Sequence, residues 1–365
     1  MKWMVTILCV FLACYSGNAL GEEAQRSIVG AIRWDAWHGD AGVKGGPEVF
    51  KTDKATLTPG LAVERALGPK HWHYRLPFYA KVISDDKVEI RANSQEVMDR
   101  EIAYAADAGL DYWAFLTYNP DSPMTLGLNL YLSSKERAKI RFCVILHHIR
   151  QKAFKEEITR IAAYFKDPQY QKVLNGRPLV YAFQCSAGKD LYDGLVAAAA
   201  ADGLPRPYFV TMGNTSGAVA FDANSSYLGK EGGWKSQAGM KLIPDVGTGW
   251  DRRPRVENPV PWEGGTPKPV ADPSSKEVAP EVIAGRVAAA IDWNRKNPVA
   301  GEANAVIIYA WNEFDEGGWL CPTLSEGTAR LDAIRKVLKP STGRTTQPSA
   351  APLPSAPAGP SEGAR

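Results

Sequence analysis

Short apolar segments alternate with segments of helical periodicity between residues 27 and 339. Several of the apolar segments carry apolar residues at successive positions, a pattern that favours parallel strands covered on both faces. An eighth and weaker strand is expected within residues 217–227. The seven clearer strand segments are residues 27–34, 111–118, 141–148, 178–184, 207–213, 241–247 and 304–311.

Five of the intervening segments have the periodicity and the boundary residues of helices. In the first, Asn93 is the expected N-cap, Glu96 completes a capping box and Gly109 ends the helix. The helix before Pro298 stops where proline breaks the pattern. The apolar faces of these two helices comprise Met98, Ile102, Ala105 and Ala106, and Ile283, Val287, Ala290 and Ile291. The predicted helices are residues 93–109, 151–166, 189–202, 275–297 and 326–339.

The alternation of eight strands with helices predicts the architecture. It extends over about 310 residues, which is typical of a (β/α)8 (TIM) barrel with long loops after its strands. A doubly wound open sheet would require a glycine-rich phosphate loop after an early strand, and residues 30–40 contain none. We therefore predict one α/β domain at residues 22–339, built as a (β/α)8 barrel.

The two ends of the chain have a different character. A signal peptide is predicted at residues 1–21 from Lys2, the apolar run at residues 3–15 and the small residues before Glu22. The apolar run is too short to be a membrane-spanning helix. The segment around Cys14 also has features of a lipoprotein signal, so a lipid anchor is an alternative. Either reading predicts a secreted or periplasmic protein. Residues 340–365 are rich in Pro, Ala, Ser and Gly and are expected to be disordered.

Composition narrows the classes of partner. The 365 residues carry a net charge of +3 without any basic run, so no nucleic-acid partner is expected. We expect a monomer without a transmembrane segment. The cysteines that remain in the domain, Cys143, Cys185 and Cys321, allow at most one disulfide, so stability must come from the apolar core.

In a (β/α)8 barrel the chemistry lies at the carboxyl ends of the strands. In this chain aromatic, amide and charged residues gather at those ends, and the sequence contains 11 Trp and 14 Tyr. Flat rings and polar groups together suit a polyhydroxylated substrate, because sugar C–H groups pack on aromatic faces. The residues predicted to bind substrate are Trp34, Asp35, Trp37, Arg75, Tyr118, His147, Trp250, Asp251, Arg252, Trp311, Asn312 and Trp319.

Two other chemistries are less well supported by the residues. A metal could be bound by His71, His73 and the pair His147–His148. Neighbouring residues on a strand point to opposite faces, however, so only one of His147 and His148 can face the barrel mouth. No Cys or Asp stands at a ligand spacing, and we expect neither a metal nor an organic cofactor. The chain has no G-x-S-x-G elbow for a serine nucleophile. The glycines of residues 225–234 lack the ending of a phosphate loop.

Three carboxyl groups follow the last predicted strand, within the segment AWNEFDEGGW at residues 310–319. Glu313 ends the strand, and Glu316 stands before a glycine pair that lets the chain curl over the same cavity. Cleavage of a glycosidic bond needs one carboxyl to protonate the leaving oxygen and a second to act on the anomeric side. We therefore predict Glu313 and Glu316 as the catalytic pair of a glycoside hydrolase, with Asp315 as a solvated or loop-fixing bystander. The alternative is that these acids only solvate the loop.

Residues 312–317 resemble the Asn-Glu-Trp-x-Glu-Gly motif of family 99 glycoside hydrolases and of the related WbsX-like barrels, with Phe314 in place of Trp. The Trp-rich first strand and the strands at 111–118 and 141–148 agree in order, and the resemblance covers about residues 27–339. Members of the family often carry a third Glu soon after the motif, where this chain has Trp319-Leu320-Cys321-Pro322.

The resemblance implies retaining, endo-acting hydrolysis of α-mannosidic linkages in which the sugar's own 2-hydroxyl participates. It implies Glu313 as the base that draws the proton from this hydroxyl and Glu316 as the general acid at the leaving oxygen. Two alternatives remain, a non-catalytic carbohydrate-binding barrel and a WbsX-like protein of glycan synthesis or modification. The signal peptide argues against the second, because sugar-nucleotide donors are cytoplasmic.

Overall fold

The structure is a computed structural model. It describes residues 26–40, 50–51, 56–147, 149, 154–185, 187–213, 219–229, 232–234, 240–263 and 278–340. The predicted signal peptide, the candidate lipidation site at Cys14, the tail beyond residue 340 and His148 lie outside these residues.

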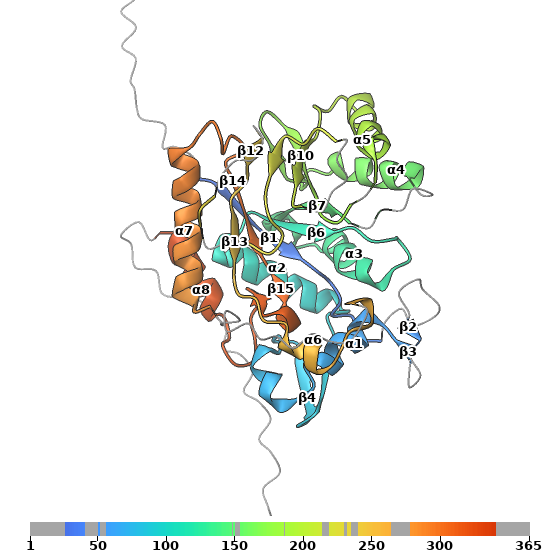
Figure 1. The fold of residues 1–365 in the computed structure, drawn as a ribbon, viewed down its shortest axis with the longest axis vertical. Helices are drawn as coiled ribbons and strands as arrows, with labels where there is room; N and C mark the ends of the chain where they lie inside the picture. Colours follow the sequence, from blue (N-terminus) through green and yellow to red (C-terminus); the bar gives the residue numbers. More distant parts are fainter. Residues whose placement is uncertain are drawn as a thin grey trace, which may run out of the picture.

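A parallel sheet forms the centre of the molecule (Figure 1). Its hydrogen-bonded order is β12-β11-β10-β9-β7-β6-β1-β14-β13, with every pair on this path parallel. The strands are β1 (Ile28–Arg33), β6 (Tyr112–Leu116), β7 (Arg141–Leu146), β9 (Arg177–Ala182), β10 (Tyr208–Thr211), β11 (Ala223–Asn224), β12 (Lys241–Leu242), β13 (Asp245–Gly247) and β14 (Ala305–Tyr309). Each of the eight predicted strand segments therefore contains a strand.

The sheet closes because β12 and β13 are two halves of one continuous segment, residues 241–247. Between the halves, the Ile243 N–H donates to the Asn224 carbonyl on β11 at 3.0 Å, and the Pro244 carbonyl accepts from the Ile307 N–H on β14 at 3.0 Å. The nine strands on the path thus occupy eight positions around a ring. The predicted (β/α)8 barrel is confirmed.

Side chains from several strands fill the inside of the ring. The Tyr112 hydroxyl on β6 reaches the Tyr181 hydroxyl on β9 at 2.8 Å and the Val306 carbonyl on β14 at 3.0 Å. Gly30 on β1 makes room for this ring, since a Cβ there would lie 2.3 Å from it. Every residue of β6 and of β14 is buried, as expected of barrel strands with a filled interior and a helical cover.

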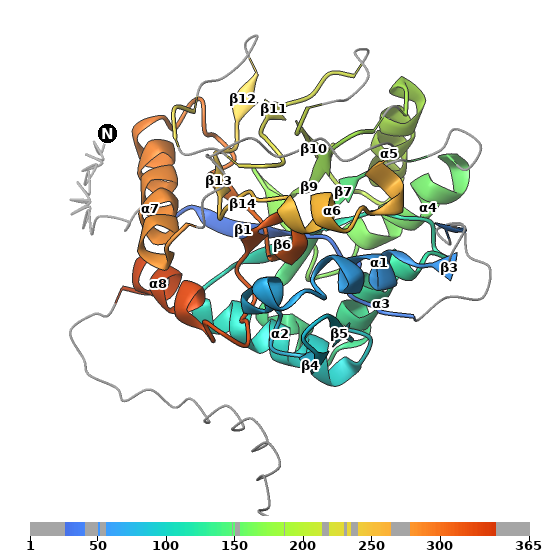
Figure 2. The same cartoon turned by 60° about the horizontal axis from the view of Figure 1, so that its bottom comes forward.

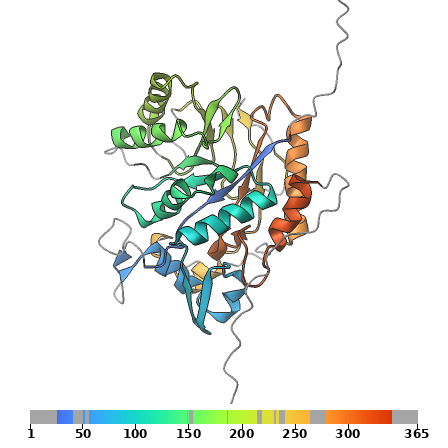
Figure 3. The same cartoon turned by 180° about the vertical axis from the view of Figure 1, so that it is seen from behind.

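Helices cover the outside of the barrel (Figure 3). α2 (Gln95–Ala108) packs between α3 (Leu126–Ser133) and α8 (Ala329–Leu338), α4 (Phe154–Phe165) packs on α5 (Lys189–Ala201), and α7 (Pro280–Lys296) packs on α8. Within the described residues no helix follows β10 or β11, so the alternation is less regular than predicted there. None of the helices in the described ranges is both long and apolar enough to cross a membrane.

The first helix boundary differs by one residue from the prediction. The N-cap of α2 is Ser94, whose hydroxyl accepts from the Val97 N–H at 3.3 Å, and not Asn93. Both residue types cap helices well, so the sequence does not separate them. Gly109 ends the helix as predicted, with a φ of 89°. The predicted apolar faces of α2 and α7 are buried, except that Ala106 and Ile291 are half-buried.

Long excursions after the strands surround the carboxyl end of the barrel (Figure 2). The excursion between β1 and α2 contains β2 (Phe50–Lys51), β3 (Thr56–Leu57), α1 (Pro59–Ala66), η1 (Lys70–Arg75), β4 (Ala80–Ser84) and β5 (Lys87–Ile90). After β13, α6 (Arg253–Glu257) packs against α1 and is followed by η5 (Pro261–Glu263). The remaining short elements are η2 (Pro123–Thr125), η3 (Arg137–Lys139), β8 (Lys172–Val173), β15 (Asn312–Glu313), η6 (Phe314–Glu316) and β16 (Gly318–Trp319). Cys143, Cys185 and Cys321 are buried free thiols.

A buried ion pair connects the carboxyl end of β1 to the outer helix α2. Arg33 at the end of β1 contacts Asp35 at 2.7 Å and Glu101 on α2 at 2.9 Å. Glu101 also accepts a hydrogen bond from the Trp311 indole at 2.9 Å. Because Arg33 and Glu101 are almost inaccessible to water, each charge depends on the other.

Replacing Glu101 by Ala is expected to lower the free energy of unfolding by about 3–5 kcal/mol, because Arg33 then stays buried without one of its two carboxylate partners. Urea denaturation of the purified protein measures the change. Asp107→Ala is the control, since it removes only a solvent-exposed ion pair with Arg335 and should leave the unfolding midpoint nearly unchanged. Equal effects of the two substitutions would show that the Arg33–Glu101 pair does not stabilise the barrel.

Candidate active site

The predicted acids lie on a short hairpin directly after β14. β15 and β16 pair antiparallel, with Asn312 opposite Trp319 and Glu313 opposite Gly318. The turn between them is η6, a single 3-10 turn that Gly317 closes with a φ of 81°. Only glycine adopts this left-handed conformation without strain, which explains the glycine after Glu316.

Hydrogen bonds to β1 fix the base of this hairpin. The Trp311 N–H donates to the Ile32 carbonyl at 2.7 Å, and the Asn312 side chain accepts from the Trp34 N–H at 3.0 Å. The Asn312 amide also donates to Asp35 at 3.1 Å. The strand that begins the barrel thus sets the position of the hairpin that follows its last strand.

The loop after β13 lies backbone to backbone against the same hairpin. The Asp251 N–H donates to the Glu316 carbonyl at 2.6 Å. A Cβ on Gly249 would lie 2.3 Å from the Gly317 carbonyl oxygen, so this approach requires glycine. The contact brings α6, which follows the loop, against η6.

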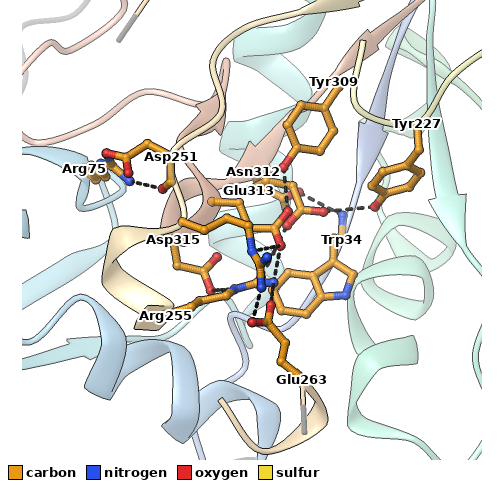
Figure 4. Close-up of polar contacts among 12 residues, drawn as sticks. Trp34, Arg75, Tyr227, Asp251, Arg255, Glu263, Tyr309, Asn312, Glu313 and Asp315 are labelled. Atoms are coloured by element: carbon orange, nitrogen blue, oxygen red, sulfur yellow. Dashed lines mark hydrogen bonds and ion pairs between the residues drawn. The ribbon is translucent and has the colours of Figure 1, made fainter. Parts of the chain in front are cut away.

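Arg255 on α6 extends into the centre of the carboxyl groups (Figure 4). Its Nε donates to Asp315 at 2.7 Å, and its Nη1 donates to Glu263 at 3.0 Å and to Glu316. Its Nη2 lies 3.8 Å from a Glu313 oxygen. The guanidinium carbon also lies 5.0 Å from the Trp34 ring and 5.5 Å from the Trp262 ring, within the range of cation–π contacts.

Each of the two glutamates also accepts a hydrogen bond from a buried tyrosine. The Tyr227 hydroxyl donates to Glu313 Oε1 at 2.9 Å, and the Tyr309 hydroxyl donates to Glu316 Oε2 at 2.7 Å. The side chain of Glu313 is 3% exposed and that of Glu316 is 11% exposed. Glu313 is therefore the more desolvated of the two, as its place at the end of the strand predicts.

The surroundings shift the protonation of the pair. Burial raises the pKa of Glu313 well above its ordinary value and the charge of Glu316 raises it further, while Arg255 opposes both effects. Burial also raises the pKa of Glu316, and Arg255 acts against it. Burial lowers the pKa of Arg255, but the charges of Asp315 and Glu316 outweigh burial and hold that pKa well above its ordinary value. Burial and the mutual repulsion of the pair therefore favour the protonated form of a glutamate, while the arginine stays charged.

The two glutamates line a cavity of about 900 Å³ at the carboxyl end of the barrel. Aromatic rings follow one another around it, and we call these rings the aromatic wall. Neighbouring members touch: the Trp34 and Trp262 rings are 5.7 Å apart, the Trp34 indole donates to the Tyr118 hydroxyl at 2.9 Å, and the Phe183 ring stacks on Tyr227 at 4.1 Å. The aromatic wall comprises Trp34, Tyr118, His147, Phe183, Tyr227, Trp250 and Trp262.

Six of the residues predicted from the sequence line this cavity, namely Trp34, Tyr118, His147, Trp250, Glu313 and Glu316. His147 donates from Nδ1 to the Phe183 carbonyl at 3.1 Å, and Trp250 is 37% exposed. Arg252 pairs with Glu263 and lies 3.9 Å from Glu316, close to the pair but outside the cavity lining.

The other predicted binding residues lie behind the cavity wall and support it. Arg75 and Asp251 bond to each other away from the glutamates (Figure 4), and Arg253 also binds Asp251. Five of the seven are hydrogen-bonded within the protein, the Trp37 and Trp319 rings pack on Phe314, and none of the seven lines the cavity. These residues are Asp35, Trp37, Arg75, Asp251, Trp311, Asn312 and Trp319.

Asp315 is fully buried, so the solvated one of the two roles expected for it is excluded. The loop-fixing role agrees with the structure, because Asp315 accepts a hydrogen bond from Arg255 at 2.7 Å. Arg255 itself was not among the residues predicted from the sequence, although its neighbours Trp250, Asp251 and Arg252 were. The other missed residues at the site are Tyr227, Glu263, Trp262, Phe183 and Tyr309. In the described part of the chain, no three His, Cys, Asp or Glu side chains gather as a metal site would require.

Comparisons with known proteins find similarity in structure. The chain is similar to a family 99 (GH99) endo-alpha-mannosidase from Bacteroides thetaiotaomicron, with 13% identity, a TM-score of 0.49, and coverage of 86% of this chain and 98% of that one. The same enzyme in complex with bis-tris-propane gives 14% identity, a TM-score of 0.47, and coverage of 81% and 87%. A family 39 glycoside hydrolase from the gut symbiont Bacteroides cellulosilyticus WH2 gives 9% identity, a TM-score of 0.39, and coverage of 68% and 62%.

No protein-family profile and no curated protein matches the sequence. The structural neighbours are glycoside hydrolases, and the similarity lies in the fold. The first two carry the name of the family that residues 312–317 resemble.

Replacing Tyr227 by Phe is expected to raise the apparent pKa of the glutamate pair further, because a hydrogen bond donated to Glu313 favours its charged form. The substitution keeps the ring that stacks on Phe183. Carbon-13 NMR of labelled glutamate side chains, followed through a pH titration, measures the midpoint. Tyr170→Phe is the matched control, since that buried hydroxyl donates to a backbone carbonyl away from the cavity. A midpoint that stays fixed or falls in Tyr227→Phe would contradict the assigned hydrogen bond.

Proposed function

We propose that this protein is a glycoside hydrolase that cleaves glycosidic bonds in an oligo- or polysaccharide, with Glu313 and Glu316 as its catalytic pair. One observation carries the proposal: two buried carboxyl groups with different hydrogen-bond partners share a cavity bordered by aromatic rings. This combination supplies both the surface that holds a sugar and the groups that break its bond.

The aromatic wall supports a carbohydrate substrate. Its rings present flat apolar faces, and its indole, phenol and imidazole groups present donors and acceptors at their edges. Cavities of 300–1,000 Å³ are typical of small-molecule sites, and the volume of about 900 Å³ is at the upper end of that range. We therefore propose that the cavity receives more than one sugar ring.

The carboxyl pair supports hydrolysis. A general acid must hold a proton at the working pH and its partner must be ionised, which requires two carboxyl groups in unlike surroundings. Glu313 and Glu316 differ in their cationic contacts, since Arg255 donates a hydrogen bond to Glu316 and not to Glu313. Hydrolysis by such a pair uses water as the co-substrate and needs no organic cofactor.

The motif at residues 312–317 supports a finer proposal. By its resemblance to family 99, we propose an α-mannoside-like substrate and a retaining mechanism in which the sugar's 2-hydroxyl attacks its own anomeric carbon. The predicted signal peptide supports a secreted or periplasmic enzyme, which would meet glycans outside the cytoplasm.

Replacing Glu313 or Glu316 by Gln is expected to lower kcat/KM by about 10²–10⁴ on any glycan that the wild type cleaves, because general acid–base catalysis is typically worth this factor. A glycan panel, with released products read by mass spectrometry, identifies the substrate. Glu302→Gln is the control, since Glu302 precedes β14 at the opposite end of the barrel and pairs with Lys241. Glycan binding without product, unchanged by both substitutions, would instead indicate a carbohydrate-binding barrel.

A substrate that lacks the 2-hydroxyl at the cleaved residue is expected to bind but not to be hydrolysed, because its own oxygen can no longer form the intermediate. The comparison uses the cleaved glycan and its 2-deoxy analogue at equal concentrations, with the initial rate of product release as the measurement. Binding of the analogue, measured by calorimetry, controls for lost affinity. Cleavage of the analogue at a normal rate would exclude participation of the 2-hydroxyl.

A further inference from the structure

Within the described parts of the chain, four residues other than glycine have a positive φ, and one of them lines the cavity. Gln184, shortly after β9, has a φ of 48°. In this left-handed region the Cβ of an ordinary residue comes too close to the backbone, so the conformation costs free energy. The other three, which are not part of the cavity lining, are Leu174, Asn175 and Asn304.

Local structure accounts for the left-handed conformation of Asn175 but not for that of Gln184. β8 and β9 pair antiparallel, and Leu174, Asn175 and Gly176 form the tight turn between them. Tight hairpin turns commonly use a positive φ, and asparagine tolerates it better than most residues. Gln184 instead lies where the chain passes from β9 to α5, and glutamine has no comparable preference for this region.

Contacts on both sides of Gln184 hold its backbone in place. Before it, the Phe183 N–H donates to the Leu146 carbonyl at 3.0 Å, and the Phe183 carbonyl accepts from His147 at 3.1 Å. After it, Cys185 is completely buried. Because the residues on either side are fixed, the chain turns at residue 184, and Gln184 lies at the surface of the cavity.

The side-chain amide of Gln184 is available to a ligand. Residue 184 is exposed, and its side chain has no hydrogen bond to any other described residue. An amide carries both a donor and an acceptor, so it can pair with a sugar hydroxyl in either direction. Several other polar side chains of the lining already bond within the protein, among them Thr117, Tyr118, Glu157, Tyr227 and Glu263.

Ring contacts connect this position to the carboxyl pair. The Phe183 ring, next to Gln184 in the chain, stacks on Tyr227 at 4.1 Å with an angle of 16° between the planes. The Tyr227 hydroxyl in turn donates to Glu313 at 2.9 Å. The position of Gln184 relative to Glu313 is therefore set by packed and hydrogen-bonded groups, and both residues line the same cavity.

We propose that Gln184 is a substrate-binding residue whose amide exchanges hydrogen bonds with a hydroxyl group of the glycan in this cavity. The strain at residue 184 then has a function, because glycine would fit this backbone more easily but carries no amide. The amide does not titrate, so its role is to bind the substrate and not to transfer protons. The inference rests on the proposed function for the nature of the ligand, but binding can be measured without hydrolysis.

Gln184→Gly is expected to raise KM by about threefold to tenfold on the glycan that the wild type cleaves, because loss of one neutral hydrogen bond typically weakens binding by this factor. The value of kcat should change by less than about twofold, since a contact made equally in the ground state and the transition state affects KM alone. Initial rates over a range of glycan concentrations measure both constants.

Asn175→Gly is the matched control. It also removes an exposed amide side chain at a positive φ, but in the turn that precedes β9, at the opposite end of the same strand. Its KM and kcat should equal those of the wild type. A KM that is unchanged in Gln184→Gly, or raised equally in both variants, would overturn the binding role.

Urea denaturation distinguishes the lost amide from a damaged fold. Glycine relieves the left-handed strain that alanine keeps, so Gln184→Gly should unfold at a higher urea concentration than Gln184→Ala. Both variants should nevertheless raise KM alike, because both lack the amide. A purely structural glutamine predicts instead that KM follows stability, with Gln184→Ala more affected than Gln184→Gly, and that result would overturn the proposal.

Calorimetry with the glycan panel separates this inference from the proposed function. Weaker glycan binding by Gln184→Gly, in a protein that releases no product, would support the binding role and overturn hydrolysis. Hydrolysis with an unchanged KM in Gln184→Gly would support hydrolysis and overturn the binding role. A protein that neither binds nor cleaves any glycan of the panel would overturn both.

Discussion

The ion pairs of Arg255 are the interaction on which the geometry of this site depends. Moving an isolated charge out of water costs several kcal/mol per ion, so a guanidinium that is 5% exposed must have partners in place. Asp315 and Glu316 supply them from the hairpin after β14, and Glu263 supplies a third from η5. The dependence is mutual, because Asp315 is fully buried and Arg255 is the cation that donates a hydrogen bond to it. The ion pairs of Arg255 therefore hold the hairpin and α6 in contact.

The closure of the barrel makes this contact available. β13 and β14 are neighbours because residues 241–247 bridge β11 on one side and β14 on the other. Their following loops consequently emerge side by side, and Thr248 fastens one to the other by donating its hydroxyl to the Tyr309 carbonyl at 2.7 Å. Gly249 and Gly317 then allow the two backbones to approach closely. A side chain at either glycine would separate Arg255 from its acids.

The barrel could be predicted from the sequence because the burial of each strand shows in the residues of that strand alone. A barrel strand is covered on both faces, so its segment is apolar at successive positions, and even the weak segment at 217–227 held β11. The N-cap of α2 was misplaced by one residue because Asn93 and Ser94 are both good caps. No helix follows β10 or β11 in the described residues, and the sequence had no helical pattern there.

Prediction of the site was less complete for a physical reason. Glu313 and Glu316 could be chosen because their place after a buried strand fixes their direction. Arg252, Arg253 and Arg255 lie almost side by side in the sequence, and only the orientation of α6 decides which one turns inward. The Tyr227 hydroxyl is just as hard to foresee, because it comes from the loop after β11, far along the chain from the acid it contacts. Contacts between loops of different strands are a property of the closed barrel.

The protonation of the two glutamates follows the same logic. A motif such as residues 312–317 determines where two carboxyl groups stand relative to the last strand, and related barrels can share that arrangement. Which carboxyl holds the proton depends on charges brought by other loops, since a neighbouring cation shifts a carboxyl pKa by about one to three units. Arg255 lies outside the motif, so likeness within the motif carries no information about it. Two barrels with the same pair of acids can therefore differ in how strongly each acid holds its proton, provided that a cation contacts a different member in each.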